Sequence, residues 1–329
     1  MLLIRCYDIY DGFTFNMAEF SIKRDPDEVF PFGMGLVVTG GEDAQKNHSI
    51  GLLRDEDDVF PFRNTPWFDL QEAYISGRIP IGNGPVIKVG KFVTLLGYEV
   101  IESPSNLNYS RGYLFTLGIP LTHTGVLASY SFADWLSVQG GLVLGWDRSN
   151  VENAGPSGTG QIAVTPIKDL TTAVNFIVGP EKSGDENPIR WVVDLTANYT
   201  GIKDVTLGFN FDYGRQENDV FLTSQGINKA AEWYGVAGYA AYDFLKAFRA
   251  AFRFEWFRDA DGVRTATPTG VNLFSTTATL QYNIWKGLYA CGEYRHDAAD
   301  EKVFGCRPDQ PCDSKSQDTI SLSLFYKFF

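Results

Sequence analysis

Long apolar runs are missing from this sequence. No uninterrupted apolar segment approaches the roughly 18 residues of a membrane-spanning helix, so the chain is not a helical membrane protein. This does not make it soluble, because a transmembrane β-strand needs only about 9–11 residues, apolar at every second position. Residues 1–12 also lack a basic start, an apolar core and a small-residue cleavage site, so no signal peptide is visible there.

Positive charge and histidine are scarce. The chain carries 28 Lys and Arg against 40 Asp and Glu, and the net charge of −12 argues against nucleic acid as a partner. Its histidines are His48, His123 and His296, and neither a glycine-rich phosphate loop nor a nucleophile elbow is found. We therefore expect no catalytic residue, no cofactor and no enzyme. A lipase built around His123 is a weaker alternative, because chance placement explains that residue better.

Aromatic residues, at 15%, and glycine, at 33 residues, are abundant instead. The last segment shows how the apolar residues are arranged, because nearly every second residue is apolar. One face of an extended chain carries Ile320, Leu322, Leu324, Tyr326 and Phe328, and the other carries Thr319, Ser321, Ser323 and Lys327. This alternation predicts a strand with one apolar and one polar face.

The same alternation recurs along the chain and predicts fifteen strands. We place them at residues 13–23, 30–40, 66–79, 84–92, 121–132, 135–147, 159–167, 170–179, 190–199, 204–214, 232–243, 247–258, 270–283, 286–296 and 317–329. Short connections alternate with long, loop-like ones. The pattern is typical of an all-β fold, a transmembrane up-and-down antiparallel β-barrel. A soluble sandwich or propeller is the alternative, but it would not need strands in unbroken up-and-down order.

Aromatic residues at both ends of strands support a membrane span. Trp191 and Tyr199 bracket the apolar face of one strand, and Trp135 and Trp146 bracket another. Eight steps of about 3.3 Å, tilted by about 40°, rise roughly 20 Å, close to the apolar band of about 25 Å in such barrels. Rings at both ends of a span fit the two interfacial girdles of an outer-membrane barrel.

A long block of sequence resembles a known family. The segment "FDLQEAYISGRIPIGNGPVIKVGKFVTLLGYEVIESPSNLNYSRGYLF", followed by "IPLTHTGVLASYSF", is similar to the signature of the bacterial outer-membrane β-barrel porin type 2, or OmpL-like, family. The resemblance implies a single domain, 1–329, in the outer membrane, surrounded by lipid and lipopolysaccharide. The C-terminal aromatic resembles the signal read by the barrel-assembly machinery, either shifted by one residue or carried by Phe328.

The strand count indicates that one strand is missing. Bacterial single-chain barrels normally have an even number of strands, and the first and last of fifteen would run the same way and could not close antiparallel. We expect residues 1–12 to be the remnant of strand one, its upstream part lost together with the signal peptide, or a short makeshift strand. With sixteen strands, 93–120 becomes the third outer loop, which in sixteen-stranded porins folds inward and narrows the channel. Such porins are commonly homotrimers.

The inward-folded loop supplies the candidate constriction. We expect Glu99, Glu102 and Arg111 to lie near the barrel wall, with Arg249, Arg253 and Arg295 as candidate partners. The arrangement would place a transverse field across the narrowest point. Alternatively, the loop acids only pin the loop to the wall.

Charged residues on the polar faces of the strands are the candidate pore lining. They are Glu72, Arg78, Lys88, Asp194, Asp212, Arg249, Arg253, Glu255, Glu293 and Arg295, with Tyr74 and Asn210 beside them. Both signs are present, so no strong ion selectivity is expected. Sixteen strands enclose more than side chains can fill, which predicts a water channel. Alternatively, these charges form ion pairs that brace the wall.

Two cysteines in the last outer loop predict a disulfide. Cys306 and Cys312 lie in "CRPDQPC", a short spacing in an oxidising compartment. No metal site is expected, because only His296 lies near them. The sequence thus predicts a porin for passive diffusion of small hydrophilic solutes and ions. A non-conducting anchor or adhesin, or less favourably an outer-membrane lipase, is the alternative.

Overall fold

The computed structural model describes residues 12–53, 66–150, 155–182, 185–217, 222, 226, 229–306 and 312–328. Within these residues, fifteen antiparallel strands form one sheet in which each strand pairs with its neighbours in sequence. The strands are β1 (Ala18–Arg24), β2 (Phe32–Gly40), β3 (Phe68–Arg78), β4 (Val86–Val93), β5 (Thr122–Ala133), β6 (Leu136–Val143), β7 (Ser157–Ile167), β8 (Leu170–Lys182), β9 (Asp185–Tyr199), β10 (Val205–Gln216), β11 (Ala231–Leu245), β12 (Phe248–Asp259), β13 (Val271–Trp285), β14 (Leu288–Ala299) and β15 (Ser316–Tyr326). All fifteen strands predicted from the alternation are present.

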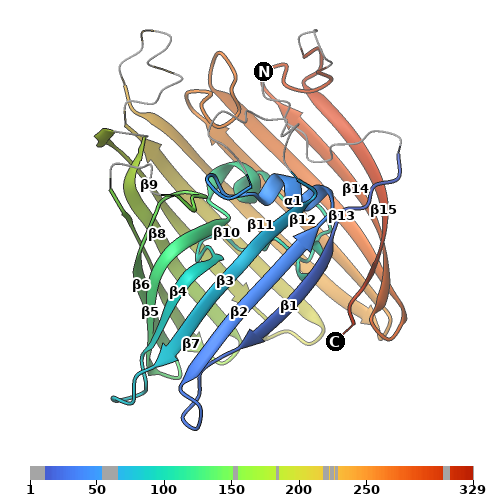
Figure 1. Cartoon of the computed structure of the whole chain (residues 1–329). Helices are drawn as coiled ribbons and strands as arrows, with labels where there is room; N and C mark the ends of the chain where they lie inside the picture. The colour runs from blue at the N-terminus through green and yellow to red at the C-terminus, as the bar shows by residue number, and fades with distance from the viewer. Residues whose placement is uncertain are drawn as a thin grey trace.

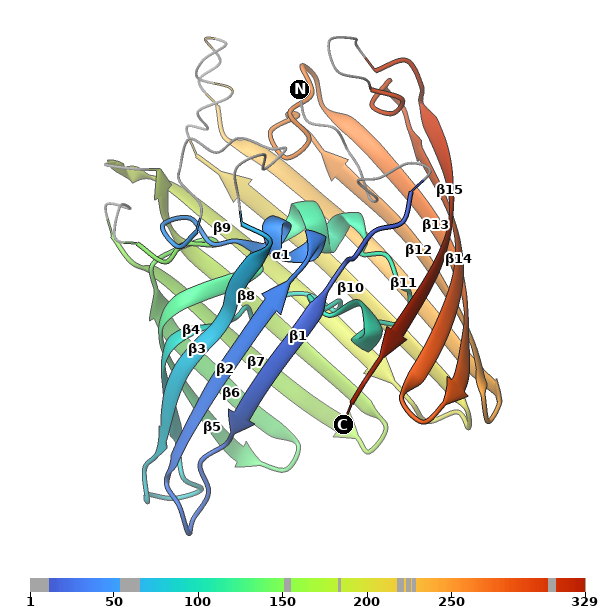
Figure 2. The ribbon, with the colours of Figure 1, turned by 45° about the vertical axis from the view of Figure 1, so that its right-hand side comes forward.

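The sheet curls into the shape of a barrel, but it is not closed (Figure 1). In the described part of the chain, β1 and β15 are its two edges, and Figure 2 shows them facing each other. Because successive strands alternate in direction, these two edge strands run the same way. The strand expected within 1–12 lies outside the described residues, apart from Gly12. Residues 13–17, predicted to open the first strand, precede β1.

The two faces of the sheet have opposite chemistry. On β12, Phe252 and Phe254 face outward and are 48% and 46% exposed, whereas Arg253 and Glu255 face the concave side and are 0% exposed. This distribution is the inverse of a soluble protein. It fits a sheet whose outer face contacts lipid, because Arg or Lys at the bilayer midplane costs about 2–4 kcal/mol.

Two parts of the sheet differ in length and in outward aromatics. The long-strand wall, β9–β14, has strands of 12–15 residues, and the short-strand wall, β1–β6, has strands of 7–12 residues. An outward ring row follows the long-loop end of the long-strand wall, with centroids 5.3–6.0 Å apart: Trp191, Tyr213, Tyr234 and Trp256. At the short-turn end, Phe244, Phe248 and Tyr282 form a second row.

Trp146 does not belong to such a girdle, and its prediction was wrong. Strand β6 ends at Val143, and Gly145, at φ 131°, takes the chain away from the strand path. Trp146 is consequently buried on the concave side, in edge-to-face contact with Trp233 at 6.2 Å.

Two connections lie on the concave side of the sheet, where both figures show them side by side (Figures 1 and 2). The first contains α1 (Glu42–Asn47), which the alternation did not predict. The second, the crossing segment, is residues 94–121, with a 3₁₀ turn, η1 (Ser103–Ser105), and a π-helical turn, η2 (Leu114–Gly118). No helix in the described ranges is long and apolar enough to cross a membrane.

An apolar cluster joins the crossing segment to the wall. It includes Leu96, Leu114 and Leu117 from the segment and Trp233 and Phe257 from the sheet, all of them buried. At about 1.5–3 kcal/mol for each large apolar side chain, this burial is a substantial driving force for holding the segment against the sheet.

Candidate functional site

The crossing segment first contacts the long-strand wall at Tyr98. The Tyr98 backbone N–H donates to Asn210 Oδ1 at 3.1 Å, and its hydroxyl donates to Asn198 Oδ1 at 2.9 Å. Its ring stacks on Tyr239 with the centroids 4.5 Å apart. Burial, together with the neighbouring Glu99, raises the pKa of Tyr98 to about 12, so the hydroxyl remains a donor at neutral pH.

A row of amides and a carboxylate crosses β6 to β10 near this contact. Gln139 donates to Gln161 at 2.9 Å, Gln161 to Asn175 at 2.7 Å, and Asn210 to Asp194 at 2.5 Å, with Asn175 bonded to the other oxygen of Asp194. The partners stand on neighbouring strands, where directly opposed side chains can touch. The row satisfies polar groups that face the concave side.

Glu293 and Glu255 bind the backbone of the crossing segment. Glu293 on β14 accepts hydrogen bonds from the backbone N–H groups of Tyr109, at 2.7 Å, and Ser110, at 3.0 Å. Glu255 on β12 accepts from the backbone N–H groups of Tyr113 and Leu114, both at 2.7 Å. Hydrogen bonds to an ionised carboxylate are about twice as strong as neutral ones.

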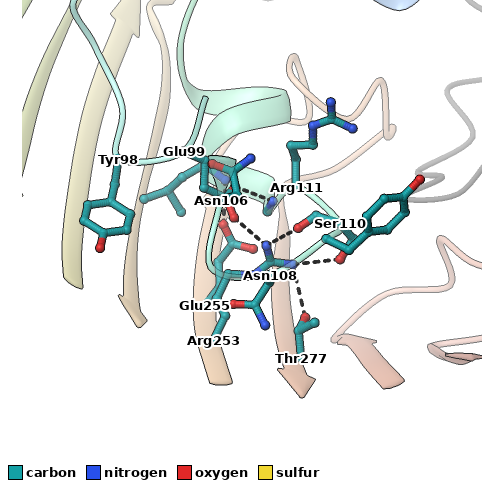
Figure 3. Close-up of polar contacts among 12 residues, drawn as sticks. Tyr98, Glu99, Asn106, Asn108, Ser110, Arg111, Arg253, Glu255 and Thr277 are labelled. Carbon is teal, nitrogen blue, oxygen red and sulfur yellow. Dashed lines mark hydrogen bonds and ion pairs between the residues drawn. The ribbon is translucent and has the colours of Figure 1, made fainter. Parts of the chain in front are cut away.

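Arg253 on β12, two residues before Glu255, binds the same segment (Figure 3). Its Nη1 donates to Glu99 Oε1 and to the Ser110 carbonyl, both at 2.5 Å, and its Nη2 donates to Thr277 Oγ1 at 3.1 Å. Glu99 Oε2 in turn accepts from the Gly112 backbone N–H at 2.6 Å. Arg253 is fully buried and Glu99 is 5% exposed, so the pair is shielded from solvent.

Arg295 on β14 completes the contact. Its Nε donates to Asp297 Oδ1 at 2.8 Å, and its Nη1 donates to the Arg111 carbonyl at 2.7 Å. The Tyr113 ring lies 5.0 Å from this guanidinium, and the Tyr113 hydroxyl donates to Asp297 Oδ1 at 2.8 Å. We call Arg253, Glu255, Glu293 and Arg295 the wall clamp.

Glycine leaves room for Glu255 at one position of the clamped backbone. A Cβ at Gly112 would lie 2.5 Å from Glu255 Oε1, closer than real Cβ contacts. The approach of Glu255 to the neighbouring N–H groups therefore depends on the missing side chain at residue 112.

The three residues expected at the constriction have different partners. Glu99 is paired with the wall, whereas Glu102 accepts a hydrogen bond from Gln71 Nε2 at 2.6 Å. Arg111 forms an ion pair of 3.0 Å with Asp43 of α1. Of the arginines considered as partners, Arg249 instead pairs with Asp243 beside a short turn, at 2.8 Å. The proximity of Arg249 to Asp243 in sequence could have indicated this.

The candidate pore-lining residues divide into a covered and a more open set. The covered set is at most 3% exposed: Glu72, Asp194, Asp212, Arg253, Glu255, Glu293 and Arg295. Lys88 lies 4.3 Å from the Tyr74 ring, Arg249 is half-buried, and Arg78 pairs with Glu28 at 3.0 Å near a short turn.

Sequence reasoning missed two acids of the site. Asp297 continues the alternation of Glu293 and Arg295 and could have been found by extending that strand past residue 296. Asp43 lies in a connection, where no periodicity indicates which side chains turn inward.

The described cysteines form one disulfide and leave one free thiol. Cys306 and Cys312 form a disulfide, and Cys291 is a buried free thiol. Within the described residues, no group of three His, Cys, Asp or Glu side chains is placed to hold a metal ion.

Solved structures similar to this chain include an outer-membrane protein and porins. A loop-deletion mutant of OmpT from Vibrio cholerae is similar with a TM-score of 0.58 at 12% identity, over 94% of this chain and 96% of that one. The anion-selective porin from Comamonas acidovorans has a TM-score of 0.61 at 10% identity, over 94% and 88%. OmpF from Salmonella typhi, in complex with daunomycin, has a TM-score of 0.59 at 13% identity, over 94% and 89%. No curated protein matches the chain.

The outward apolar face and the inward charges are those of an integral outer-membrane β-barrel, a fold that the solved structures share, and the family match places the chain in the porin class. A family model described as "Putative beta-barrel porin-2, OmpL-like" matches residues 5–328. The chain belongs to this OmpL-like family of β-barrel porins.

Proposed function

We propose that the protein forms a water-filled channel for passive diffusion of small hydrophilic solutes and ions. The observation that carries the proposal is the charged concave face of β9–β14, which holds a connection by its backbone. A wall that only anchored a protein in lipid would not need to position an internal segment in this way. In this proposal, the long loops face the cell exterior.

The proposal includes a closed barrel of sixteen strands. It is supported by the two edge strands, β1 and β15, which run the same way, so that one further strand between them satisfies both edges in antiparallel pairing. An open edge in lipid would leave backbone groups without partners.

The crossing segment is proposed to narrow the channel, with unequal roles for its charges. The burial of Glu99 against Arg253 supports a role in pinning the segment, whereas Glu102 is more exposed and is proposed to border the path. We expect Glu99→Gln to give larger and noisier conductance with little change in selectivity. We expect Glu102→Gln to shift the reversal potential toward anions at similar conductance.

A homotrimer is proposed as the assembly, inserted by the barrel-assembly machinery into lipid and lipopolysaccharide. One similar solved structure, OmpT of Vibrio cholerae, is described as a trimer form, with a TM-score of 0.55 at 10% identity. The mass of the folded protein in detergent, measured by light scattering, tests this. A monomeric mass would refute it.

Planar-bilayer conductance tests the channel itself, with reversal potentials in a salt gradient to give its ion preference. A porin gives discrete conductance steps. An anchor or adhesin gives none, and detergent-dependent release of fatty acid would support the lipase instead. Discrete steps from the purified wild-type protein, absent from a mock preparation, are the expected result.

A further inference from the structure

The connection between β2 and β3 is bound to the short-strand wall. We call residues 41–53 the shelf. The backbone N–H of Asp43 donates to the Asn16 carbonyl at 3.0 Å, and that of Ile50 donates to the Asp147 carbonyl at 2.8 Å. Asn16 precedes β1 and Asp147 follows β6, so the shelf reaches from one end of the short-strand wall to the other.

Side chains fix the shelf between these two points. His48 Nε2 donates to the Phe68 carbonyl at 2.7 Å, and the hydroxyls of Ser49 and Thr122 are 2.8 Å apart. His48 and Ser49 are each 1% exposed. The shelf is therefore attached at β3 and β5 as well, independently of the crossing segment.

The crossing segment is attached mainly to the opposite side, through the wall clamp on β12 and β14, and at one point to β3, through the Glu102–Gln71 hydrogen bond. The main anchors of the two inward segments thus lie on different parts of the sheet. They meet where Arg111 Nη2 lies 3.0 Å from Asp43 Oδ2. Figures 1 and 2 show α1 beside a helical turn of the crossing segment at this level.

We propose that the Asp43–Arg111 ion pair is a releasable tie between the shelf and the crossing segment, and that it limits the cross-section of the channel. The inference rests on the proposed channel function. The tie attaches neither segment to its wall, so its loss leaves both anchored and lets the seam between them widen. It is charge-assisted and only partly shielded, because the Arg111 side chain is 16% exposed and that of Asp43 6%.

The neighbours of the tie favour a local role. The Arg111 guanidinium also donates to the Ile101 carbonyl, within its own segment. Lys46 Nζ lies 3.7 Å from the other oxygen of Asp43, within the shelf. Each partner is thus held by its own segment, so replacing one of them should change the seam more than the fold.

Conductance of two single variants gives the first test. Asp43→Asn removes the charge from the tie, and we expect the ratio of tied to released states to fall about tenfold, seen as larger and noisier steps. Lys46→Gln is the matched control, because it changes a charge 3.7 Å from Asp43 without touching Arg111. Wild-type steps in both variants, or equal increases in both, would overturn the inference.

A reversible cross-link gives the second test and does not depend on the strength of the tie. Asp43→Cys and Arg111→Cys are combined in a background with Cys6→Ser and Cys291→Ser, and a short bis-methanethiosulfonate reagent joins the two thiols. We expect wild-type conductance in the cross-linked channel and larger conductance after reduction. Asp43→Cys alone, treated in the same way, should not respond to the reductant.

The outcomes separate this inference from the proposed function. Wild-type protein without conductance steps overturns the channel and, with it, the tie. Normal wild-type steps, with equal conductance before and after reduction of the cross-linked pair, overturn the tie alone.

Discussion

The long-strand wall and the short-strand wall hold their inward segments by different means. Strands β9–β14 use buried charges, with Arg253 and Glu255 0% exposed and bound to the crossing segment. Residues that flank strands β1–β6 hold the shelf mainly by backbone hydrogen bonds. The same short-strand wall carries one buried pair, Lys91–Asp69 at 3.6 Å, and one pair, Lys23–Glu72, whose lysine is 45% exposed. The comparison teaches that similar charged residues on one concave face can have very different energetic weight, depending on whether a segment covers them.

Removing one cation from each wall is the strongest way to test this difference. Arg253→Met should lower the free energy of unfolding by about 3–5 kcal/mol, because it leaves the buried Glu99 without its partner. Lys23→Met should cost less, about 1 kcal/mol, because solvent screens the exposed lysine even though Glu72 is buried. Urea unfolding in lipid vesicles measures both. Equal losses would show that the two walls do not differ.

Two glycines sharpen the comparison within the long-strand wall. Gly112→Ala should cost about 1–3 kcal/mol, because its Cβ would come 2.5 Å from Glu255 Oε1 and push the clamp apart. Gly238→Ala on β11 is the control, because a Cβ there would meet nothing within 4 Å. The same unfolding assay should show no loss for the control. A neutral Gly112→Ala would mean that the backbone contact is loose.

The outward ring row should contribute less than the clamp. Tyr234→Leu should lower the unfolding free energy by about 0.5–1.5 kcal/mol, because the Tyr234 ring packs against Tyr213 at 6.0 Å and Trp256 at 5.7 Å. Val126→Leu, on the short-strand wall, keeps an exposed aliphatic side chain and should be neutral. If Tyr234→Leu lowered the unfolding free energy as much as Arg253→Met, contacts on the outer face would contribute as much to stability as the wall clamp.

The effect of Tyr98 is absent at neutral pH and appears only in alkali. Because its folded-state pKa is about 12, against an ordinary value of about 10, the unfolded chain ionises first as the pH rises. The wild type should therefore lose stability relative to Tyr98→Phe between about pH 10 and pH 12, and not below pH 10. Unfolding at a series of pH values measures this. If the unfolding free energies of the wild type and Tyr98→Phe change with pH in the same way, the Tyr98 hydroxyl is exposed to water and the expectation is wrong.

The strands could be predicted because an apolar outer face and a polar concave face impose period-two alternation on each of them, as Phe252 and Arg253 illustrate. Trp146 was assigned wrongly because the chain leaves the strand path after Val143, which alternation alone does not reveal. The attachment of Glu99 to Arg253 also required the fold. The partners are 154 residues apart, and no local pattern distinguishes a pairing acid from a lining one.

The wall clamp has a consequence for how such a channel can evolve. Its carboxylates and guanidinium groups bind backbone N–H and carbonyl groups of residues 109–114, so these contacts depend little on the side chains there. The exception is Arg253, which also binds the Glu99 side chain. In the proposed channel, substitutions at a position such as Tyr109 can then alter what the passage favours without relocating the segment. Apart from Gly112, where the backbone needs space, side chains on the segment can therefore change while the segment keeps its place against the wall.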